Sequence, residues 1–359
     1  HTSSRRQRQM CIRDSLNTVN IKDSTNDFVK LISHSGIIKD LKLNTTTAFT
    51  SKFVNIANGV TTQFTNSDSN NNEIYIKGTF NHNGNVSLIV DDDISKTIPD
   101  LVIDNGDTLV LSSNIELPSN LIVNGTITSD GKTLTTTGTG NVTINSQSSL
   151  QSTTFNNCGL IKLVNLDTNS VMSSLILDSC VGMQVAGGSV DISTLTIKNA
   201  TSQFLVIDSN HSGTISDVTI DTNNSHDLSF INLFSNSTTL TNVFMKGNFK
   251  HSGSKNVLID RNNDTNITIP NLLIKSGDTF ALSNDLTLPS NLVVQSGGIL
   301  SVNQKTINKE SYASGNITIN TGSSSLETTI FDNCGLIKLV NLCLLYTSPS
   351  PRDSRRARM

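Results

Sequence analysis

A short apolar pattern recurs every 20 to 25 residues and strongly constrains how this chain can fold. Writing Φ for an apolar residue, the pattern Φ-x-x-Φ-x-Φ occurs at Met172/Leu175/Leu177, Ile192/Leu195/Ile197, Ile215/Val218/Ile220 and Leu240/Val243/Met245, preceded by Leu150/Thr153/Phe155. Alternate residues of a strand face the same side, so each copy can bury one apolar face. A single copy cannot bury that face alone. The recurrence therefore predicts an all-β chain whose turns, of about 20–26 residues, stack strand upon strand.

Two details refine this prediction. The first interval of the pattern is one residue longer than strict alternation, which predicts a bend or bulge after the first apolar residue. A second apolar column precedes the first by about ten residues, at Ile161, Met183, Phe204 and Phe230. Clusters rich in Ser, Asn and Gly separate the two columns and are typical of turns.

The chain also repeats itself on a longer scale. "GDTLVLSSNIELPSNLIV" (106–123) resembles "GDTFALSNDLTLPSNLVV" (277–294), and Cys158–Leu166 is identical to Cys334–Leu342. The order of such matches is preserved along the chain at offsets near 170 residues. We therefore expect a first long repeat at 16–203 and a second, truncated repeat at 204–342.

Both ends differ in composition from the interior. Of nine Arg, only Arg261 lies within 16–342, whereas all 17 Lys lie there, against 27 Asp and Glu, giving a formal charge of −9. The end sequences "RRQRQMCIRDS" and "CLLYTS" can be encoded by one DNA element in opposite orientations, which resembles a sequencing-library adapter. We expect 1–15 and 343–359 to be non-native adapter-like segments and the chain to be a metagenomic fragment. The rival interpretation is a pair of basic tails that bind nucleic acid or membrane.

The period and the apolar columns over most of 28–342 resemble the right-handed parallel β-helix of the pectate-lyase-like superfold. That family includes surface adhesins, tailspikes and polysaccharide-cleaving enzymes. The resemblance implies a structural or adhesive extracellular repeat protein, a stalk or surface-binding solenoid. It would lie outside the cell, on the cell surface or on a virion surface. The alternative that it implies is a polysaccharide lyase or hydrolase of the same fold.

Two interpretations are open for 85–148 and 255–320. Short alternating strands with Asn-Gly and Asp-Gly turns fit hairpins of an inserted β-sandwich. They also fit a continuous solenoid with tighter turns, which we favour.

Candidate chemistry is sparse. Cys158 and Cys180 follow the apolar pattern at the same offset, as does Ala200 one turn later, so we expect a ladder of small buried residues. "DDD" at 91–93 could contribute to a calcium site, but its counterpart in the second copy, 260–264, contains Arg261, so we expect a solvated loop. His34 and His211 recur in matching turns, as do His82 and His251, whereas His226 has no counterpart; none of the five has a nucleophile nearby in sequence.

We therefore predict no catalytic residue, no metal ligand and no cofactor. The expected partners are surface glycans or other cell-surface molecules, bound weakly and multivalently. A negative interior with few aromatic residues predicts no nucleic-acid binding, and no apolar run is long enough to span a membrane. The residues predicted to form the structural core ladder are Cys158, Cys180, Ile192, Leu195, Ile197, Ile215, Val218, Ile220, Leu240, Val243 and Met245.

Overall fold

The computed structural model of the chain is all-β, with parallel strands stacked as a β-solenoid of about ten turns. This confirms the fold class predicted from the apolar period. The part of the chain that the structure describes contains no helix of the length and apolarity that a membrane crossing needs. The structure describes residues 16–22, 29–31, 36–39, 41–44, 54–56, 63–65, 73–77, 79–82, 89–90, 100–117, 119–136, 140–202, 204–221, 225–226, 230–246, 248–251, 259–261, 264–282, 284–320, 324, 326 and 328–340.

The contacts divide the chain into two compact units. The first extends to residue 222 and also holds 228–243 and 257–270, while the second holds 223–227, 244–256 and the chain from residue 271 onward. The adapter-like segments predicted at 1–15 and 343–359 lie outside the described residues, as does "DDD" at 91–93.

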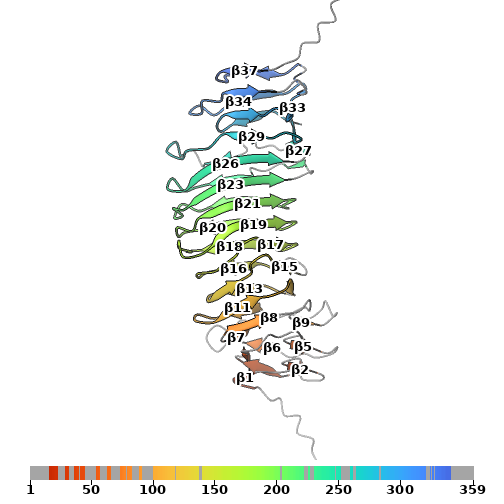
Figure 1. The fold of residues 1–359 in the computed structure, drawn as a ribbon, viewed down its shortest axis with the longest axis vertical. Coiled ribbons are helices and arrows are strands. Elements are labelled where there is room, and N and C mark those ends of the chain that lie inside the picture. Colours follow the sequence, from red (N-terminus) through yellow and green to blue (C-terminus); the bar gives the residue numbers. More distant parts are fainter. Residues whose placement is uncertain are drawn as a thin grey trace, which may run out of the picture. The chain divides into compact units, whose positions relative to one another are not determined.

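One parallel sheet of eleven strands runs through the first unit (Figure 1). Its strands, in spatial order, are β1 (Val19–Lys22), β4 (Leu41–Asn44), β7 (Glu73–Lys77), β10 (Asp100–Ile103), β13 (Leu121–Val123), β16 (Val142–Ile144), β18 (Leu160–Val164), β20 (Gly182–Ala186), β22 (Leu205–Ile207), β25 (Ile231–Leu233) and β28 (Ile259–Asp260).

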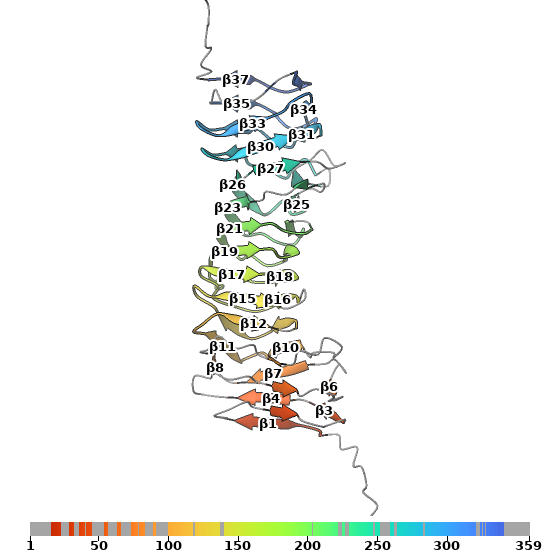
Figure 2. The ribbon, with the colours of Figure 1, turned by 90° about the vertical axis from the view of Figure 1, so that its right-hand side faces the viewer.

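A second sheet of the first unit faces the first across the core (Figure 2). Its strands are β12 (Ile115–Leu117), β15 (Thr133–Thr136), β17 (Thr153–Asn156), β19 (Met172–Asp178), β21 (Ile192–Lys198) and β23 (Thr214–Asp221), followed by β26 (Thr239–Lys246). Smaller parallel sheets contain β2 (Val29–Leu31), β5 (Val54–Ile56) and β9 (Ile89–Val90); β3 (Ile37–Lys39) and β6 (Gln63–Thr65); and β8 (Thr79–His82), β11 (Thr108–Leu111) and β14 (Thr126–Thr128).

The second unit repeats this arrangement with up to three strands in each turn. One row contains β29 (Leu272–Ile274), β32 (Leu292–Val294), β35 (Ile317–Ile319) and β37 (Ile337–Leu339). A second row contains β24 (Ser225–His226), β27 (Asn248–His251), β30 (Thr279–Leu282) and β33 (Ile299–Ser301). A third row contains β31 (Leu286–Leu288), β34 (Thr306–Lys309) and β36 (Ile330–Phe331).

The recurring apolar pattern forms vertical columns inside the first unit, and each apolar residue of one turn pairs with its equivalent in the next. Buried Leu and Ile side chains each contribute about 1.5–3 kcal/mol relative to an exposed position, so the columns hold successive turns together. The pairs are Met172–Ile192–Ile215, Leu175–Leu195–Val218 and Leu177–Ile197–Ile220.

The extra residue in the pattern produces a bend. The register between β19 and β21 pairs Met172 with Ile192 and resumes at Ser174, so Ser173 lies outside the ladder. Two consecutive residues then face outward, as the burial of the strand shows. The bend lets one long strand cover a width of the core that two short strands cover in earlier turns.

Thr153, the polar exception in the pattern, lies within the apolar column. It pairs in register with Leu175 and is fully buried. Its hydroxyl donates a hydrogen bond to the carbonyl oxygen of Ser129 in the preceding turn. The bond removes most of the cost of burying a hydroxyl.

The second apolar column is shifted by one residue from the sequence prediction in its later turns. Met183 of β20 pairs with Leu205, and Leu205 pairs with Ile231, rather than with the phenylalanines that precede them. Phe204 and Phe230 are nevertheless buried, with ring centroids 4.9 Å apart in an edge-to-face arrangement. Each ring thus fills the corner before its strand, where two consecutive residues point inward.

The stretches 85–148 and 255–320 belong to the solenoid rather than to an inserted sandwich, wherever the structure describes them. Leu101 pairs in parallel with Leu121, and Leu292 with Ile317, so their strands stack between turns instead of folding back as hairpins. Most turns span 19 to 26 residues, but the step from Leu41 to Ile74 spans 33. The steps from Ile231 to Ile259 and from Phe249 to Phe280 span 28 and 31 residues. The predicted turn length is therefore too narrow at the start of the chain and again after residue 231.

The two long repeats share local backbone geometry as well as sequence. Ser152 and Thr328, which are equivalent in the two copies, both have φ of 52°. Asn157 and Asn333, also equivalent, have φ of 52° and 49°. Left-handed conformations are uncommon outside glycine, and Asn tolerates them best. Their recurrence places the same sharp turn before the same strand in each copy.

Candidate functional site

All residues predicted for the structural core ladder are buried. Their exposed fractions are 6% for Leu240 and 2% or less for the others: Cys158, Cys180, Ile192, Leu195, Ile197, Ile215, Val218, Ile220, Val243 and Met245. Ala200, at the position equivalent to the two cysteines, is 3% exposed. These side chains fill the interior, so they are not available to a ligand.

Cys158 and Cys180 are free thiols on successive turns. The sulfur of Cys158 lies 3.5 Å from the carbonyl oxygen of Leu134, and that of Cys180 lies 3.3 Å from the carbonyl oxygen of Phe155. The neighbouring thiol of Cys180, together with burial, raises the pKa of Cys158, and the neighbouring thiol of Cys158 lowers the pKa of Cys180. Both thiols therefore act as small buried side chains that bond to the turn before.

Cys334 repeats this environment in the second unit. Its sulfur lies 3.1 Å from the carbonyl oxygen of Ile307, the residue equivalent to Leu134. Burial raises the pKa of its thiol, although Cys334 is only half-buried. The same contact in both copies identifies it as part of the repeat.

The most regular polar constellation is a ladder of side chains that immediately precede the strands of the eleven-stranded sheet. Asn120 donates through Nδ2 to Oδ1 of Asp100 at 2.9 Å and accepts from the backbone N–H of Asn141 at 2.7 Å. Asn141 in turn accepts from the N–H of Leu160 at 2.7 Å. Each amide thus satisfies a backbone donor of the next turn.

The second unit contains an equivalent ladder. Asn291 donates to Oδ1 of Asn271 at 3.0 Å and accepts from the N–H of Asn316 at 2.9 Å. Asn316 accepts from the N–H of Leu336 at 2.7 Å. A leucine, Leu160 or Leu336, therefore ends the ladder in each copy. We call these two sets the asparagine ladders.

Sequence reasoning did not identify the asparagine ladders, although a signal for them exists. Each ladder residue directly precedes an apolar-x-apolar triplet that lies in a strand. The six stretches are "DLVI" (100–103), "NLIV" (120–123), "NVTI" (141–144), "NLLI" (271–274), "NLVV" (291–294) and "NITI" (316–319). High Asn content here supplies hydrogen-bond partners between turns, which is a structural use.

Other acidic and amide side chains have the same use. Oδ1 of Asp191 accepts from the N–H of Thr214 at 2.7 Å, and Oδ1 of Asp285 accepts from the N–H of Thr306 at 2.8 Å. Both carboxylates bond to the backbone of the following turn, which holds successive turns in register.

Of the five interior histidines, His211 is the one whose side chain the structure describes. It is fully buried, with Nδ1 2.8 Å from the hydroxyl of Thr238 and Nε2 3.1 Å from the carbonyl oxygen of Val190. A carbonyl only accepts, so Nε2 carries the proton and Nδ1 accepts from Thr238 in the neutral ring. Burial lowers the pKa of His211 against the attraction of Asp191. The ring is a satisfied core group.

Arg261 is the single arginine within residues 16–342. It is 6% exposed, and its Nη1 donates to the carbonyl oxygen of Ile267 at 2.9 Å. The guanidinium thereby anchors the segment that follows it, which starts with the turn from Arg261 to Asp264. This location gives Arg261 a structural role.

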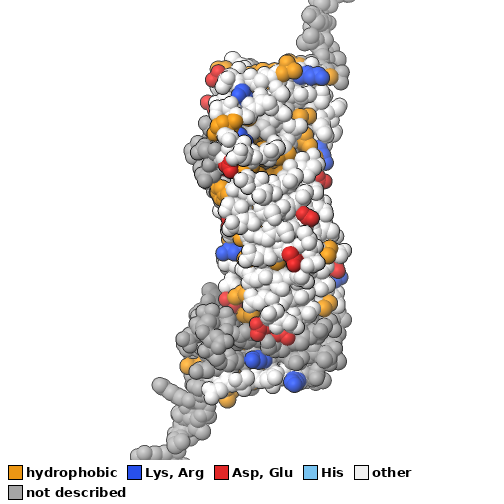
Figure 3. All heavy atoms as spheres, turned by 90° about the vertical axis from the view of Figure 1, so that its left-hand side faces the viewer, with side chains coloured by type: hydrophobic (Ala, Val, Ile, Leu, Met, Phe, Trp, Pro, Cys, Tyr) orange, Lys and Arg blue, Asp and Glu red, His pale blue; other side chains and the backbone are white. Residues whose placement is uncertain are grey.

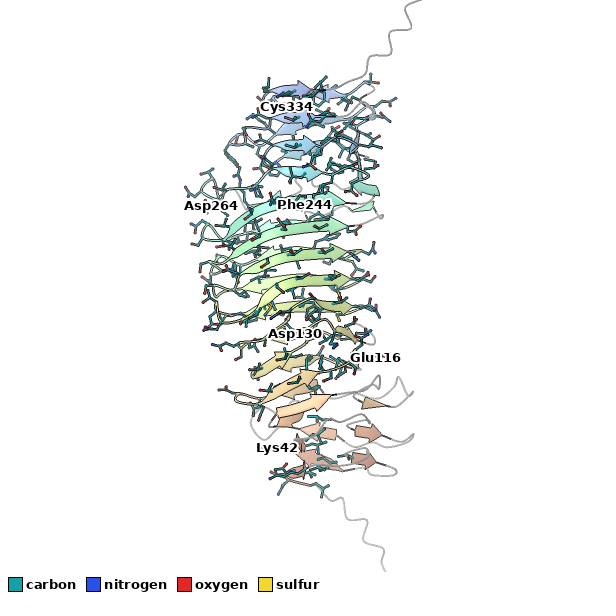
Figure 4. All side chains as sticks on the ribbon, viewed as in Figure 1. Lys42, Glu116, Asp130, Phe244, Asp264 and Cys334 are labelled. Carbon is teal, nitrogen blue, oxygen red and sulfur yellow. The ribbon has the colours of Figure 1, made fainter. Side chains whose placement is uncertain are left out.

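Four charged side chains of the first unit are labelled in Figure 4. Lys42, Glu116, Asp130 and Asp264 come from separate elements and do not point toward a common site (Figure 4). Within the described part of the chain, no group of three or more His, Cys, Asp or Glu side chains is arranged to hold a metal ion.

The outward face of the second sheet instead carries a column of small polar residues. Thr133, Thr154, Ile176, Thr196 and Thr219 pair in register from β15 to β23. Parallel strands lie about 4.8 Å apart, so these side chains repeat at that spacing. The one apolar member, Ile176, interrupts an otherwise uniform column of threonines.

A second outward column alternates in charge. Lys198 pairs in register with Asp178 on one side and with Asp221 on the other. Opposite charges on adjacent strands favour this register modestly. On the face shown in Figure 3, charged side chains stand singly among uncharged polar atoms.

Comparisons with protein-family models, with curated proteins and with solved structures gave no match to this chain.

Proposed function

We propose that this chain is part of a structural or adhesive extracellular protein, a surface-binding stalk of the right-handed pectate-lyase-like class. The observation that carries the proposal is an outward column with a threonine on four of five successive turns, interrupted by Ile176; its threonines are Thr133, Thr154, Thr196 and Thr219. A surface that repeats one weak contact every turn gains affinity through multivalency. Surface glycans, whose hydroxyl groups repeat along a chain, are partners of matching chemistry.

The hydrogen bonds between successive turns support a structural role. Side-chain acceptors of Asn120, Asn141, Asn291 and Asn316 each bind a backbone donor of the next turn. Together with the apolar columns, they stabilise every turn against its neighbour rather than creating a recess for a substrate. Such stability, accumulated turn by turn, suits a spacer that resists proteases.

The proposal is tested by comparing binding at low and high surface density. Beads carrying the chain at graded densities would be incubated with immobilised neutral and acidic polysaccharides, in parallel with the free chain. We expect capture to rise more steeply than bead density, and the double variant Thr196→Lys/Thr219→Lys to reduce it at least about tenfold. Lys162→Ala, on the opposite sheet, is the matched control.

The same polysaccharides serve to test the enzyme alternative. Prolonged incubation with the free chain, followed by measurement of new reducing ends and of unsaturated sugar products, should give no increase over buffer. Saturable release of either product would refute the stalk proposal, and so would capture that is linear in density and insensitive to the threonine variants.

A further inference from the structure

Two Asn-Gly pairs lie in neighbouring turns of the first unit but in different environments. The sequence contains four such pairs, and the structure describes two of them, Asn105-Gly106 and Asn124-Gly125. Both asparagines are exposed, whereas Gly106 is exposed and Gly125 is buried. Glycine lacks a Cβ, so its nitrogen can approach the preceding side chain more closely than that of any other residue.

The first pair forms the centre of a tight turn between β10 and β11. The N–H of Asp107 donates to the carbonyl oxygen of Asp104 at 3.0 Å, and Gly106 has φ of 84°, as the third residue of a type II turn requires. An added Cβ at Gly106 would meet no atom within 4 Å. Among the described residues, none accepts a hydrogen bond from the N–H of Gly106. Its nitrogen is therefore unhindered and already free to react.

The second pair is held in place by the preceding turn. The N–H groups of Asn124 and Gly125 both donate to the carbonyl oxygen of Ile103, at 2.8 and 3.0 Å. Nδ2 of Asn145 donates to Oδ1 of Asn124 at 2.9 Å. An added Cβ at Gly125 would overlap with the carbonyl oxygen of Asp104, so the two backbones are in close contact. A reaction between Gly125 and the Asn124 side chain therefore requires this turn to open first.

The second long repeat contains the first turn without its amide. Ser276 takes the place of Asn105, and the following Gly277 has φ of 85°. The N–H of Asp278 donates to the carbonyl oxygen of Lys275 at 3.2 Å, which closes the same turn. The turn thus forms with serine as well as with asparagine, and Asn105→Ser is a variant that the repeat itself supplies.

We propose that Asn105 is a site of spontaneous deamidation in the folded protein. The backbone nitrogen of Gly106 forms a bond to Cγ of Asn105, the bond from Cγ to Nδ2 breaks, and ammonia leaves with the proton from the Gly106 nitrogen. Water is the other reactant. It opens the resulting succinimide at Cγ to give aspartate, or at the main-chain carbonyl carbon to give isoaspartate.

Either product changes the turn between β10 and β11. A negative charge is added in sequence between Asp104 and Asp107, and like charges at this separation repel one another. In isoaspartate the main chain also gains a carbon atom within the turn, which displaces the Asp107 N–H from the Asp104 carbonyl oxygen. The inference concerns this turn alone and is independent of the adhesive function.

Site-resolved peptide mapping tests the proposal. The full chain would be incubated in mildly alkaline buffer, with aspartate and isoaspartate quantified separately at each asparagine by mass spectrometry. We expect Asn105 to react at least about tenfold faster than Asn124, because only the second site must open locally. In the urea-unfolded chain, where neither turn is formed, the two rates should agree within about threefold. Asn105→Ser provides the blank for the peptide that contains this site.

A variant of the neighbouring residue tests the attacking group. Gly106→Ala adds a methyl group in open space and should slow the reaction at Asn105 at least about tenfold, because the Cβ hinders the nitrogen. Gly277→Ala, the same change in the equivalent turn, is the matched control and should leave the rate at Asn105 unchanged. Hydrogen exchange at 108–111 should be the same in both variants and in the unmodified chain, which confirms that β11 remains folded. In the isoaspartate product the Asp107 amide should exchange faster.

Three results would overturn the proposal. The first is a rate at Asn105 in the folded chain that is equal to or lower than the rate at Asn124. The second is an unchanged rate at Asn105 in Gly106→Ala. The third is an unmodified Asn105 in the folded chain over a period in which the same residue reacts in the urea-unfolded chain, which would show that the turn protects it.

Discussion

Replacement of Asn291 by alanine tests whether the asparagine ladders hold successive turns together. The side chain makes three hydrogen bonds: Nδ2 donates to Asn271 at 3.0 Å, and Oδ1 accepts from the N–H of Asn316 at 2.9 Å and from the hydroxyl of Ser314 at 2.6 Å. Alanine removes all three at once. The Asn316 N–H is part-buried, so water can replace its partner only incompletely.

The expected loss follows from these environments. A part-buried hydrogen bond contributes about 1 kcal/mol net, and each of the two exposed bonds contributes about 0.5 kcal/mol. The total is about 2 kcal/mol of local stability. Asn291→Asp keeps both acceptor bonds and loses only the donation to Asn271, so it should cost less than alanine. Gln295→Ala, at an exposed position directly after β32, is the matched control.

Native-state hydrogen exchange is the appropriate assay, because a stacked repeat opens locally rather than in one step. A loss of about 2 kcal/mol corresponds to exchange of the Asn316 amide about 30-fold faster, since 1.36 kcal/mol equals a factor of ten. The rate should be nearly unchanged in Gln295→Ala. Acceleration of less than about threefold in Asn291→Ala would refute the assigned role of the ladder.

Three further predictions concern other positions. Gly188→Ala should cost about 3 kcal/mol in urea unfolding, because Gly188 has φ of 75° and an added Cβ would lie 2.1 Å from the Leu166 carbonyl oxygen, whereas Gly106→Ala, with open space and φ of 84°, should cost about 1 kcal/mol. Burial lowers the pKa of His211 in the folded protein below its ordinary value of 6.5. The contribution of the neutral ring to the free energy of unfolding should therefore be fully present above about pH 6.5 and decline as the pH falls below it. A pH titration of unfolding should show no such decline from this residue in His211→Gln. Iodoacetamide footprinting by mass spectrometry should label Cys334 at least about tenfold faster than Cys158, and equal rates would contradict the burial described here.

The fold was predictable because its strongest determinant is local in sequence. Ile192, Leu195 and Ile197 repeat one pattern that the next turn copies, and the register pairs them as the pattern predicts. The bend at Ser173 was also visible, as one residue too many between the first two apolar positions. Periodicity alone therefore identified the strands, their stacking and their inward faces.

The prediction of the second apolar column was less accurate, because two consecutive apolar residues are both compatible with the inward position of the strand. Phe204 precedes Leu205, and both are buried. A larger side chain is the obvious candidate for a core position, but the strand pairing selects Leu205 and leaves the ring to the corner. Sequence pattern does not distinguish a corner from a strand when both face inward.

The asparagine ladders were not predicted because the high asparagine content of the chain made their members indistinguishable from other asparagines. Asn is common throughout the chain, so Asn120 and Asn141 did not stand out until their shared position before a strand was visible in space. The role of Arg261 was likewise not predicted, because the first copy has no arginine at the corresponding position and the bond to Ile267 depends on the local turn.

The leucine that ends each asparagine ladder constrains how such an array can change its length. A recombination event that adds or removes a whole repeat leaves every amide oxygen opposite its backbone donor and moves Leu160 to the position of Leu336. An exchange at any other spacing would seat Asn141 against the wrong turn and leave its partner N–H without an acceptor. Inherited variation in the number of repeats should therefore occur in whole repeats, with the leucine at the same position in each.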